Sequence, residues 1–331
     1  MKILMTGLDY KSSELSVREK FAVTKEKSKN IMKAYMDLPF IEGCVIIFTC
    51  NRTEIYISIE DRSQFNIAEF LCRTLELDAD KYIAHFTERN EQETFFHLCR
   101  VAAGIDSQIL GDDQIITQVR ESLESSREIG FTDGYIEKIF GTAIKTAKEI
   151  KTNIIVRSAR IASAPYKAVE KIKSLSWVEG KKAVVIGNGQ MGRLTAELLM
   201  SESAHVTLTL REYKKGVIQI PAGAKTIGYS KRYDAIENAH IVISATTSPH
   251  YTLRHADFIK IVNIPEFVID LAVPRDVEPD IGELSGLSLF TIDDLGDENA
   301  SLPEEKMILA DQIIEKNMQN YYKWRKYKEN I

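Results

Sequence analysis

A glycine-rich segment at residues 187–192 has residue types and spacing that suit the phosphates of a dinucleotide. Its sequence, GNGQMG, directly follows the apolar run Ala183–Ile186 and opens a helical pattern that continues to Met200. Glycine lets the backbone approach a pyrophosphate, whose charge is stabilised at a helix N-terminus. A glycine turn in a nucleotide-free α/β domain is the alternative. Because the motif has the strand–turn–helix context, we expect a dinucleotide site formed by Gly187, Asn188, Gly189, Gln190, Met191 and Gly192.

The end of the next strand pattern indicates which dinucleotide binds. An acidic residue about 20 positions after the glycines would bind the ribose 2′-hydroxyl of NAD. This sequence has Arg211 there. A guanidinium suits a 2′-phosphate, so the sequence favours NADPH, with Lys214 and Lys215 as assisting cations. The neighbouring Glu212 keeps NAD open as an alternative.

Cys50 is a second candidate for chemistry, as a nucleophile. It begins the polar turn Cys50–Thr53 between two strand patterns, and Arg52 follows two residues later. A nearby cation favours the thiolate, which is the nucleophilic form of cysteine. A buried structural cysteine is the alternative. The other three cysteines lie in apolar runs and are expected to be inert.

Three further features of the sequence each have two possible interpretations, one functional and one structural. His97 falls in a helical pattern, where it is either functional or a core histidine with satisfied hydrogen bonds. Polar residues between Gly104 and Gln118 either line a pocket or form a solvated face. Basic residues are concentrated between Lys145 and Lys173, and such a stripe either binds a phosphate backbone or is a solvated helix face. The six histidines show no ligand clustering, so no metal site is expected.

The patterns around these residues predict more than one domain. A chain of 331 residues, 44% hydrophobic and 27% charged, is typical of a globular protein of about two domains. The first 60 residues predict a βαββ opening, with strands at Ile3–Leu8, Gly43–Thr49 and Glu54–Ile59 and a capping box at Ser16–Glu19. Residues 90–173 predict helices almost throughout.

Alternating β and α patterns then predict a parallel sheet, with strands at Ala183–Ile186, His205–Leu210, Ile241–Ser244 and Phe267–Asp270. The last 30 residues lack glycine and predict one long amphipathic helix. The fold class is therefore a multidomain α/β and α+β protein. We expect an N-terminal α+β catalytic domain over residues 1–155, a Rossmann-type NADP-binding domain over residues 156–295 and a long C-terminal helix over residues 296–331.

The net charge, the cysteines and the N-terminal residues indicate where in the cell the protein is located. The formal net charge of −5 excludes a strongly basic coat for nucleic acid. Four cysteines without a CxxC pair indicate reduced intracellular thiols. The N-terminus has no signal-peptide core, and no run approaches 18 apolar residues. We therefore expect a cytoplasmic protein that does not contact a membrane.

Three stretches together resemble the glutamyl-tRNA reductase family, whose NADPH-dependent enzymes open the five-carbon route to tetrapyrroles. Residues 49–56, TCNRTEIY, resemble the nucleophile motif of that family. Residues 97–118 are similar to its second signature. Residues 268–279, followed by residues 292–295, are similar to its third signature. The resemblance covers nearly the whole chain.

The resemblance implies a two-step reaction. The Cys50 thiolate attacks the ester carbonyl that joins glutamate to tRNA, which gives a thioester and releases the tRNA. A hydride from NADPH then reduces the thioester to glutamate-1-semialdehyde. The resemblance also implies that His97 is needed for activity and that Arg52 pairs with a substrate carboxylate. The family's substrate-binding positions are occupied here by Thr49, Asn51, Ser107, Asp112, Asp113, Gln114 and Gln118.

The sequence also departs from the family pattern. Asp112 stands in place of a glutamate and Thr117 in place of a glycine, and Pro165 is expected to kink or end a helix. The C-terminal dimerisation helices are missing, so the family's homodimer is in doubt. The C-terminal helix resembles the family's spine, and a downstream aminomutase is an implied partner. Two alternatives stay open: a degenerate relative with a binding or regulatory role, and another NADP-dependent oxidoreductase.

Overall fold

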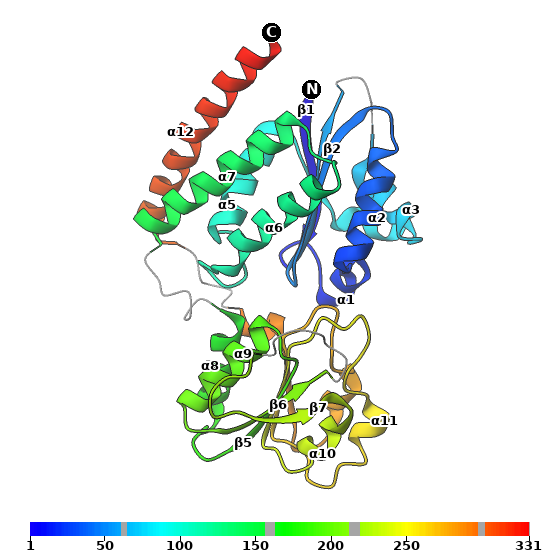
Figure 1. The fold of residues 1–331 in the computed structure, drawn as a ribbon, viewed down its shortest axis with the longest axis vertical. Coiled ribbons are helices and arrows are strands. Elements are labelled where there is room, and N and C mark those ends of the chain that lie inside the picture. The colour runs from blue at the N-terminus through cyan, green and yellow to red at the C-terminus, as the bar shows by residue number, and fades with distance from the viewer. Residues whose placement is uncertain (61–64, 156–162, 212–218, 297–301, 331) are drawn as a thin grey trace. The chain divides into compact units, whose positions relative to one another are not determined.

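The structure is a computed structural model that describes residues 1–60, 65–155, 163–211, 219–296 and 302–330 (Figure 1). The chain divides into two compact units. Unit 1 comprises Met1–Ala159 and Glu298–Ile331, and unit 2 comprises Arg160–Asp297. An antiparallel sheet, a parallel sheet and a long C-terminal helix confirm the expected fold class. The expected boundary at residue 155 adjoins residues 156–162, which lie outside the described residues.

Unit 1 is built on a four-stranded antiparallel sheet of order β2-β3-β1-β4. One face packs against α2 and α3, and the other packs against α5, α6 and α7 (Figure 1). Alternation along β2 explains this, because Cys44 and Ile46 enter the first core while Val45 and Ile47 enter the second. The strands are β1 (Lys2–Asp9), β2 (Ile41–Phe48), β3 (Arg52–Ile59) and β4 (Thr87–Arg89). The helices over the first face are α1 (Leu15–Arg18), α2 (Lys25–Met36), α3 (Ile67–Thr74) and α4 (Ala79–Tyr82).

The predicted capping box at Ser16–Glu19 is wrong. Helix α1 has Glu14 at its N-cap, so Ser16 lies inside the helix and cannot cap its start. A capping box is instead formed at α5, where the Asn90 side chain accepts from the Glu93 N–H and the Glu93 side chain accepts from the Asn90 N–H.

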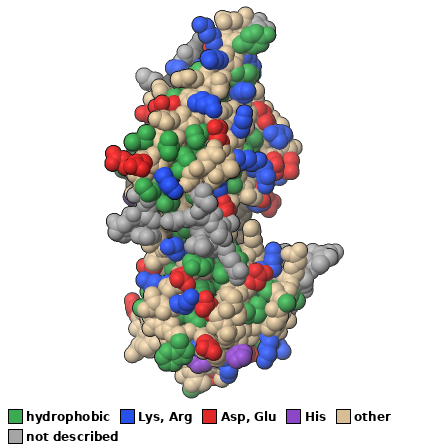
Figure 2. Space-filling view, turned by 90° about the vertical axis from the view of Figure 1, so that its left-hand side faces the viewer, with side chains coloured by type: hydrophobic (Ala, Val, Ile, Leu, Met, Phe, Trp, Pro, Cys, Tyr) green, Lys and Arg blue, Asp and Glu red, His purple; other side chains and the backbone are tan. Residues whose placement is uncertain are grey.

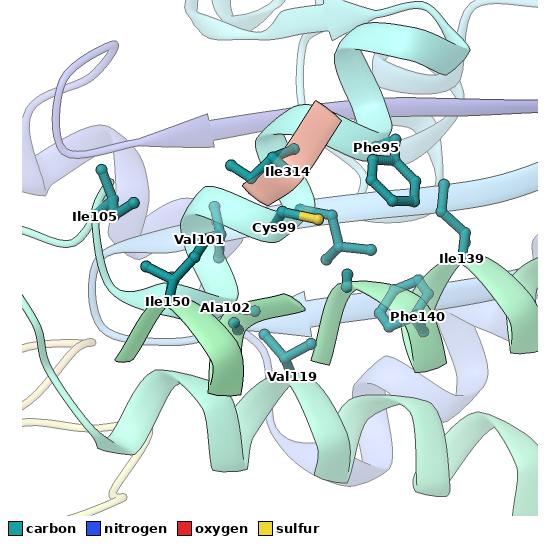
Figure 3. Packing of buried hydrophobic residues seen from close by; sticks show 14 of the residues in the cluster. Phe95, Cys99, Val101, Ala102, Ile105, Val119, Ile139, Phe140, Ile150 and Ile314 are labelled. Atoms are coloured by element: carbon teal, nitrogen blue, oxygen red, sulfur yellow. The ribbon is translucent and has the colours of Figure 1, made fainter. Parts of the chain in front are cut away.

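The helical region of unit 1 forms a second layer with a continuous apolar core. It contains α5 (Glu91–Ala103), α6 (Gln114–Glu128) and α7 (Gly134–Asn153). The long C-terminal helix, α12 (Glu304–Glu329), packs beside α5 and α7 and buries Ala310, Ile314 and Tyr321 there. Figure 3 shows Phe95 and Cys99 of α5 among Ile139 and Phe140 of α7 and Ile314 of α12.

Unit 2 is a six-stranded parallel sheet of order β10-β9-β8-β5-β6-β7, the strand order of dinucleotide-binding folds. The four predicted strands are confirmed as β5 (Lys182–Ile186), β6 (His205–Leu210), β8 (Ile241–Ser244) and β9 (Phe267–Asp270). Two edge strands, β7 (Lys225–Gly228) and β10 (Ser288–Thr291), were not predicted because they are short and only partly buried. The helices are α8 (Ala164–Leu175), α9 (Gln190–Ser201), α10 (Arg232–Ile236) and α11 (His255–Phe258).

Pro165 does not kink or end a helix, contrary to the expectation. It lies in the first turn of α8, where the missing N–H would have no intrahelical partner in any case. The basic stripe is divided between two helices. Lys145 and Lys148 lie on α7 of unit 1, whereas Lys167 and Lys171 lie on α8 of unit 2.

Within the described ranges, no helix is long and apolar enough to cross a membrane.

Candidate active site and dinucleotide site

Cys50 lies at the tip of the hairpin that joins β2 to β3. The Thr49 N–H donates to the Arg52 carbonyl at 2.9 Å, which leaves Cys50 and Asn51 as a two-residue turn. The Asn51 N–H donates to Thr49 Oγ1 at 3.1 Å, and the Tyr10 N–H donates to the Asn51 carbonyl at 3.0 Å. These bonds hold the turn in one conformation. Cys50 is half-buried at this tip and is not part of a disulfide.

The other cysteines lie inside the cores. Cys44, Cys72 and Cys99 are all buried, and Cys99 is seen within the helical layer of unit 1 (Figure 3). Burial raises the pKa of each of these thiols above its usual value. Because a neutral buried thiol is a poor nucleophile, the structure supports the expectation that these three are inert.

A buried network of polar groups follows the turn along β3. Arg52, Glu54 and Tyr56 alternate along the strand and therefore project from one face. Arg52 Nη1 donates to Glu54 Oε1 at 2.6 Å, and the Tyr56 hydroxyl donates to Glu54 Oε2 at 2.7 Å. His97 of α5 lies over the same face, with its Nε2 2.8 Å from Glu54 Oε1. Three groups thus converge on one carboxylate that is 1% exposed.

The network keeps Glu54 ionised and orients His97. Burial by itself raises the pKa of a carboxyl group, but the charges and hydrogen bonds of His97 and Arg52 hold the pKa of Glu54 below its usual range. An ionised Glu54 accepts a hydrogen bond from His97 Nε2–H. The other ring nitrogen, Nδ1, then faces Asp106, whose Oδ2 is 3.8 Å away. The carboxylate therefore fixes the orientation of the ring and keeps a proton on Nε2.

The loop between α5 and α6, which contains Asp106, is fixed at both ends. Arg52 Nη2 donates to the carbonyl of Asp106, which ties the loop to the start of β3. At its other end, Lys151 Nζ of α7 donates to the carbonyls of Gly111 at 3.2 Å and Asp112 at 2.9 Å. The loop that carries Ser107, Asp112 and Asp113, three of the expected substrate-binding residues, is thereby held between the hairpin and α7.

Two carboxyl groups in this loop have different surroundings. Burial raises the pKa of Asp112 to about 6, and its Oδ1 accepts from the Gln114 N–H at 2.9 Å. Asp113 instead forms an ion pair with Lys151 at 2.6 Å. A carboxylate with a cation beside it is stabilised, whereas the charge of Asp112 is disfavoured by its burial.

The structure joins some of the expected site residues and separates others. Arg52 and His97 meet at Glu54, and Thr49, Cys50 and Asn51 form the adjacent turn. Ser107 lies in the loop, and Gln114 and Gln118 lie on the first turns of α6. The roles assigned to these residues stay predictions.

Sequence reasoning missed Glu54, Tyr56, Asp106 and Lys151. The alternation of Arg52, Glu54 and Tyr56 on a strand flanked by apolar residues was a usable signal for Glu54 and Tyr56. Asp106 and Lys151 gave no signal, because their contacts depend on how separate helices pack.

The glycine-rich loop of unit 2 has the shape that a dinucleotide requires. Gly187 has φ +105°, and a Cβ there would lie 2.5 Å from the Ala245 carbonyl oxygen. A Cβ on Gly192 would lie 1.9 Å from the Gly187 carbonyl oxygen, so only glycine lets α9 start this close to β5. A Cβ on Gly189 would meet nothing within 4 Å, so the loop is open at that point.

Polar groups at this loop also fit a dinucleotide. Helix α9 begins after Gly189 with no side-chain cap, and uncapped N–H groups at a helix start suit phosphate oxygens. The Asn188 Oδ1 is buried without a hydrogen-bond partner in the part of the chain that the structure describes. Arg211 is exposed at the end of β6, where the sequence placed it. Lys214 and Lys215 lie outside the described residues.

Among the described side chains, no group of three or more His, Cys, Asp or Glu residues is arranged to hold a metal ion.

Comparison with known proteins identifies relatives of both units. Residues 6–154 match the family model "Glutamyl-tRNAGlu reductase, N-terminal domain", and residues 168–298 match the model "Shikimate / quinate 5-dehydrogenase". A glutamyl-tRNA reductase of Alkaliphilus oremlandii is 41% identical over 332 residues, which cover 100% of this chain and 99% of the relative. A glutamyl-tRNA reductase of Acetivibrio thermocellus is 40% identical over 335 residues, which cover 100% of this chain and 99% of that relative.

A solved structure supports the fold. The glutamyl-tRNA reductase from Methanopyrus kandleri aligns with a TM-score of 0.50 and 24% identity, covering 99% of this chain and 82% of that chain.

Proposed function

Because this chain belongs to the glutamyl-tRNA reductase family, we propose that it reduces the glutamyl group of glutamyl-tRNA to glutamate-1-semialdehyde with NADPH, through a thioester on Cys50. Family membership makes the protein an oxidoreductase of tetrapyrrole synthesis. Its Shikimate / quinate 5-dehydrogenase match in unit 2 implies a dinucleotide cofactor.

The observation that carries the proposal is the half-buried Cys50 at a rigid turn that leads into the Arg52–Glu54–His97 network. In the proposed first step the Cys50 thiolate attacks the ester carbonyl carbon. The carbon–oxygen bond to the tRNA breaks, a carbon–sulfur bond forms, and the tRNA hydroxyl takes up a proton. His97, oriented by Glu54, is the group we assign to moving protons in this step.

The expected pairing of Arg52 with a substrate carboxylate is limited by contacts that Arg52 already makes within the protein. Its side chain is 1% exposed and donates both to Glu54 and to the Asp106 carbonyl. A substrate carboxylate would reach Nη2 by replacing the Asp106 carbonyl, which requires the loop between α5 and α6 to shift. The pairing of Arg52 with substrate stays a prediction.

The cofactor assignment follows from the glycine-rich loop. Residues 187–192 would hold the pyrophosphate, and Arg211 would pair with the 2′-phosphate that distinguishes NADPH from NADH. When bound, NADPH supplies the hydride that reduces the thioester to the aldehyde. An aminomutase partner, a cytoplasmic location and the state of oligomerisation also stay predictions.

The test uses glutamyl-tRNA that carries labelled glutamate, with Cys50→Ser and a control, Cys72→Ala, in which a buried thiol is removed. Without NADPH, wild type and Cys72→Ala are expected to trap labelled glutamate as a thioester, and Cys50→Ser is expected to trap none. With NADPH, only the first two release semialdehyde. A wild-type protein that binds NADPH but forms neither thioester nor aldehyde would support the degenerate relative instead.

A further inference from the structure

One face of α7 carries lysines and points to solvent. Lys138, Lys145 and Lys148, with Gly141 among them, are spaced by three or four residues and share one side of the helix. The opposite side buries Ile136, Ile139, Phe140, Ala143, Ala147 and Ile150 in the core. Lys145 and Lys148 are exposed, and Lys138 is half-buried. We call these four positions the lysine face.

The acidic residues of α7 do not neutralise this face. Glu137 forms an ion pair with Arg127 at 2.6 Å on the side toward α6. Glu149 is 3.6 Å from Lys316 and accepts a hydrogen bond from Asn317 on the side toward α12. Each acid therefore lies beside the lysine face and already has its own partner.

Helix α12 extends the positive charge. Lys138 and Lys328 each lie 5.4 Å from the ring centroid of Trp324, so cations from both helices meet over one indole. Lys323 and Lys326 are exposed on the same half of α12. Figure 2 shows the side of unit 1 on which α12 lies, where basic side chains lie among acidic and hydrophobic ones.

Gly141 is a second, independent observation on this face. It is exposed in the interior of a 20-residue helix, and a Cβ built on it would meet nothing within 4 Å. Glycine in a helix interior is less favourable than alanine, and the fold itself does not require it here. A bare backbone between Lys138 and Lys145 lets a ligand lie close against the helix.

The lysine face leads to the candidate active site within unit 1. Lys151 follows Lys148 by three residues, about 4.5 Å along the helix axis. Lys151 bonds the carbonyls of Gly111 and Asp112 in the loop that Arg52 also contacts. A polyanion on the lysine face would therefore end beside that loop.

We propose that the lysine face, together with Lys323 and Lys328 of α12, binds the phosphate backbone of the tRNA that carries the glutamyl group. The inference rests on the proposed function and adds where the RNA contacts the protein. A protein of net charge −5 attracts a polyanion only through such a local concentration of cations. RNA helices are recognised largely through phosphates and shape, which lysines on a helix face can serve.

The first test reverses two charges. Lys145→Glu/Lys148→Glu is compared with Lys27→Glu/Lys33→Glu, which makes the same change of net charge on exposed positions of α2. The probes are uncharged tRNA for binding and glutamyl-tRNA for kinetics, at salt between 50 and 200 mM. Only the α7 variant is expected to lose affinity, by about tenfold or more at low salt, and its slope of log affinity against log salt should fall by about 2.

The second test adds bulk without removing charge. Gly141→Leu places a helix-favouring side chain at an open position, so its thermal midpoint should be at least that of wild type. We expect KM for glutamyl-tRNA to rise several-fold while kcat and the affinity for NADPH stay at wild-type values. A purely structural glycine would show the gain in stability and no change in KM.

The outcomes separate this inference from the proposed function. If wild type reduces glutamyl-tRNA but the α7 variants keep its KM and salt slope, the lysine face is overturned and the proposed function stands. If the α2 control loses as much affinity as the α7 variant, the effect is one of net charge and the inference is also overturned. If wild type neither binds tRNA nor reduces glutamyl-tRNA, the proposed function fails and the inference fails with it.

Discussion

At the residue scale, Glu54 accepts hydrogen bonds from Arg52, Tyr56 and His97 while nearly inaccessible to water. Glu54→Gln keeps the shape of the side chain but leaves the buried Arg52 charge uncompensated. We expect the free energy of unfolding to fall by about 3 kcal/mol, as for other buried ion pairs that lose one partner. We also expect kcat to fall more than KM rises, because His97 loses its orienting acceptor. Urea unfolding and steady-state kinetics measure the two effects.

The control for this change is Glu69→Gln on α3, where the carboxylate pairs with Arg73 at the surface. Exposed pairs contribute about 0–1 kcal/mol, so this variant should unfold and react almost as wild type does. Equal losses in both variants would contradict the special role of the buried carboxylate.

Asp112 gives a prediction about pH, also at the residue scale. Burial raises its pKa to about 6, compared with about 3.9 for an unperturbed aspartate. Between these pH values the native state holds more protons than the unfolded state, so this group lowers the free energy of unfolding as pH rises from about 4 to about 6. Asp112→Asn removes this loss while its amide oxygen can still accept from the Gln114 N–H.

The thermal midpoint of Asp112→Asn should therefore exceed that of wild type at pH 7.5, and the difference should shrink toward pH 4. Scanning calorimetry across this range makes the comparison. If the difference in thermal midpoint between Asp112→Asn and wild type is the same at every pH, the fold does not disfavour the charge of Asp112.

At the element scale, the loop between β5 and α9 separates a folding role from a binding role within a few residues. Gly192→Ala is expected to destabilise unit 2, because its Cβ would lie 1.9 Å from the Gly187 carbonyl oxygen. Gly189→Ala meets nothing within 4 Å and should leave the fold intact, yet it fills space that a pyrophosphate needs. Thermal unfolding and NADPH titration of both variants test this, and a Gly189→Ala protein with wild-type NADPH affinity would refute the assigned position of the phosphates.

Elements also differed in how well the sequence predicted them. The central strands β5, β8 and β9 were predicted because buried parallel strands are continuous apolar runs. The edge strand β7 was missed because its side chains are largely exposed and give no such run. Pro165 was misassigned because sequence alone did not show that α7 ends at Asn153 and that a new helix begins at Ala164.

At the scale of the whole molecule, each unit has its own core, and α12 belongs to the core of unit 1. Tyr321 is fully buried, with its ring centroid 5.4 Å from that of Phe95. Tyr321→Ala should cost unit 1 about 3–5 kcal/mol, the usual result of removing a buried aromatic ring. Hydrogen exchange should accelerate in α5, α7 and α12 and stay unchanged in the sheet of unit 2. Equal acceleration in both units would show that the two cores unfold together.

The sequence by itself determined the features that depend on neighbouring residues. The glycine-rich loop, the apolar strands and the long C-terminal helix could be predicted from the spacing of nearby residues. This is because backbone conformation and burial repeat with the period of each element. Only the tertiary structure decided which distant groups meet. It brought His97 to Glu54 from 43 residues away and Lys151 to the loop before α6. Such contacts form when whole helices and strands pack against one another. The residues that meet in this way show no periodic pattern in the sequence from which their contact could be predicted.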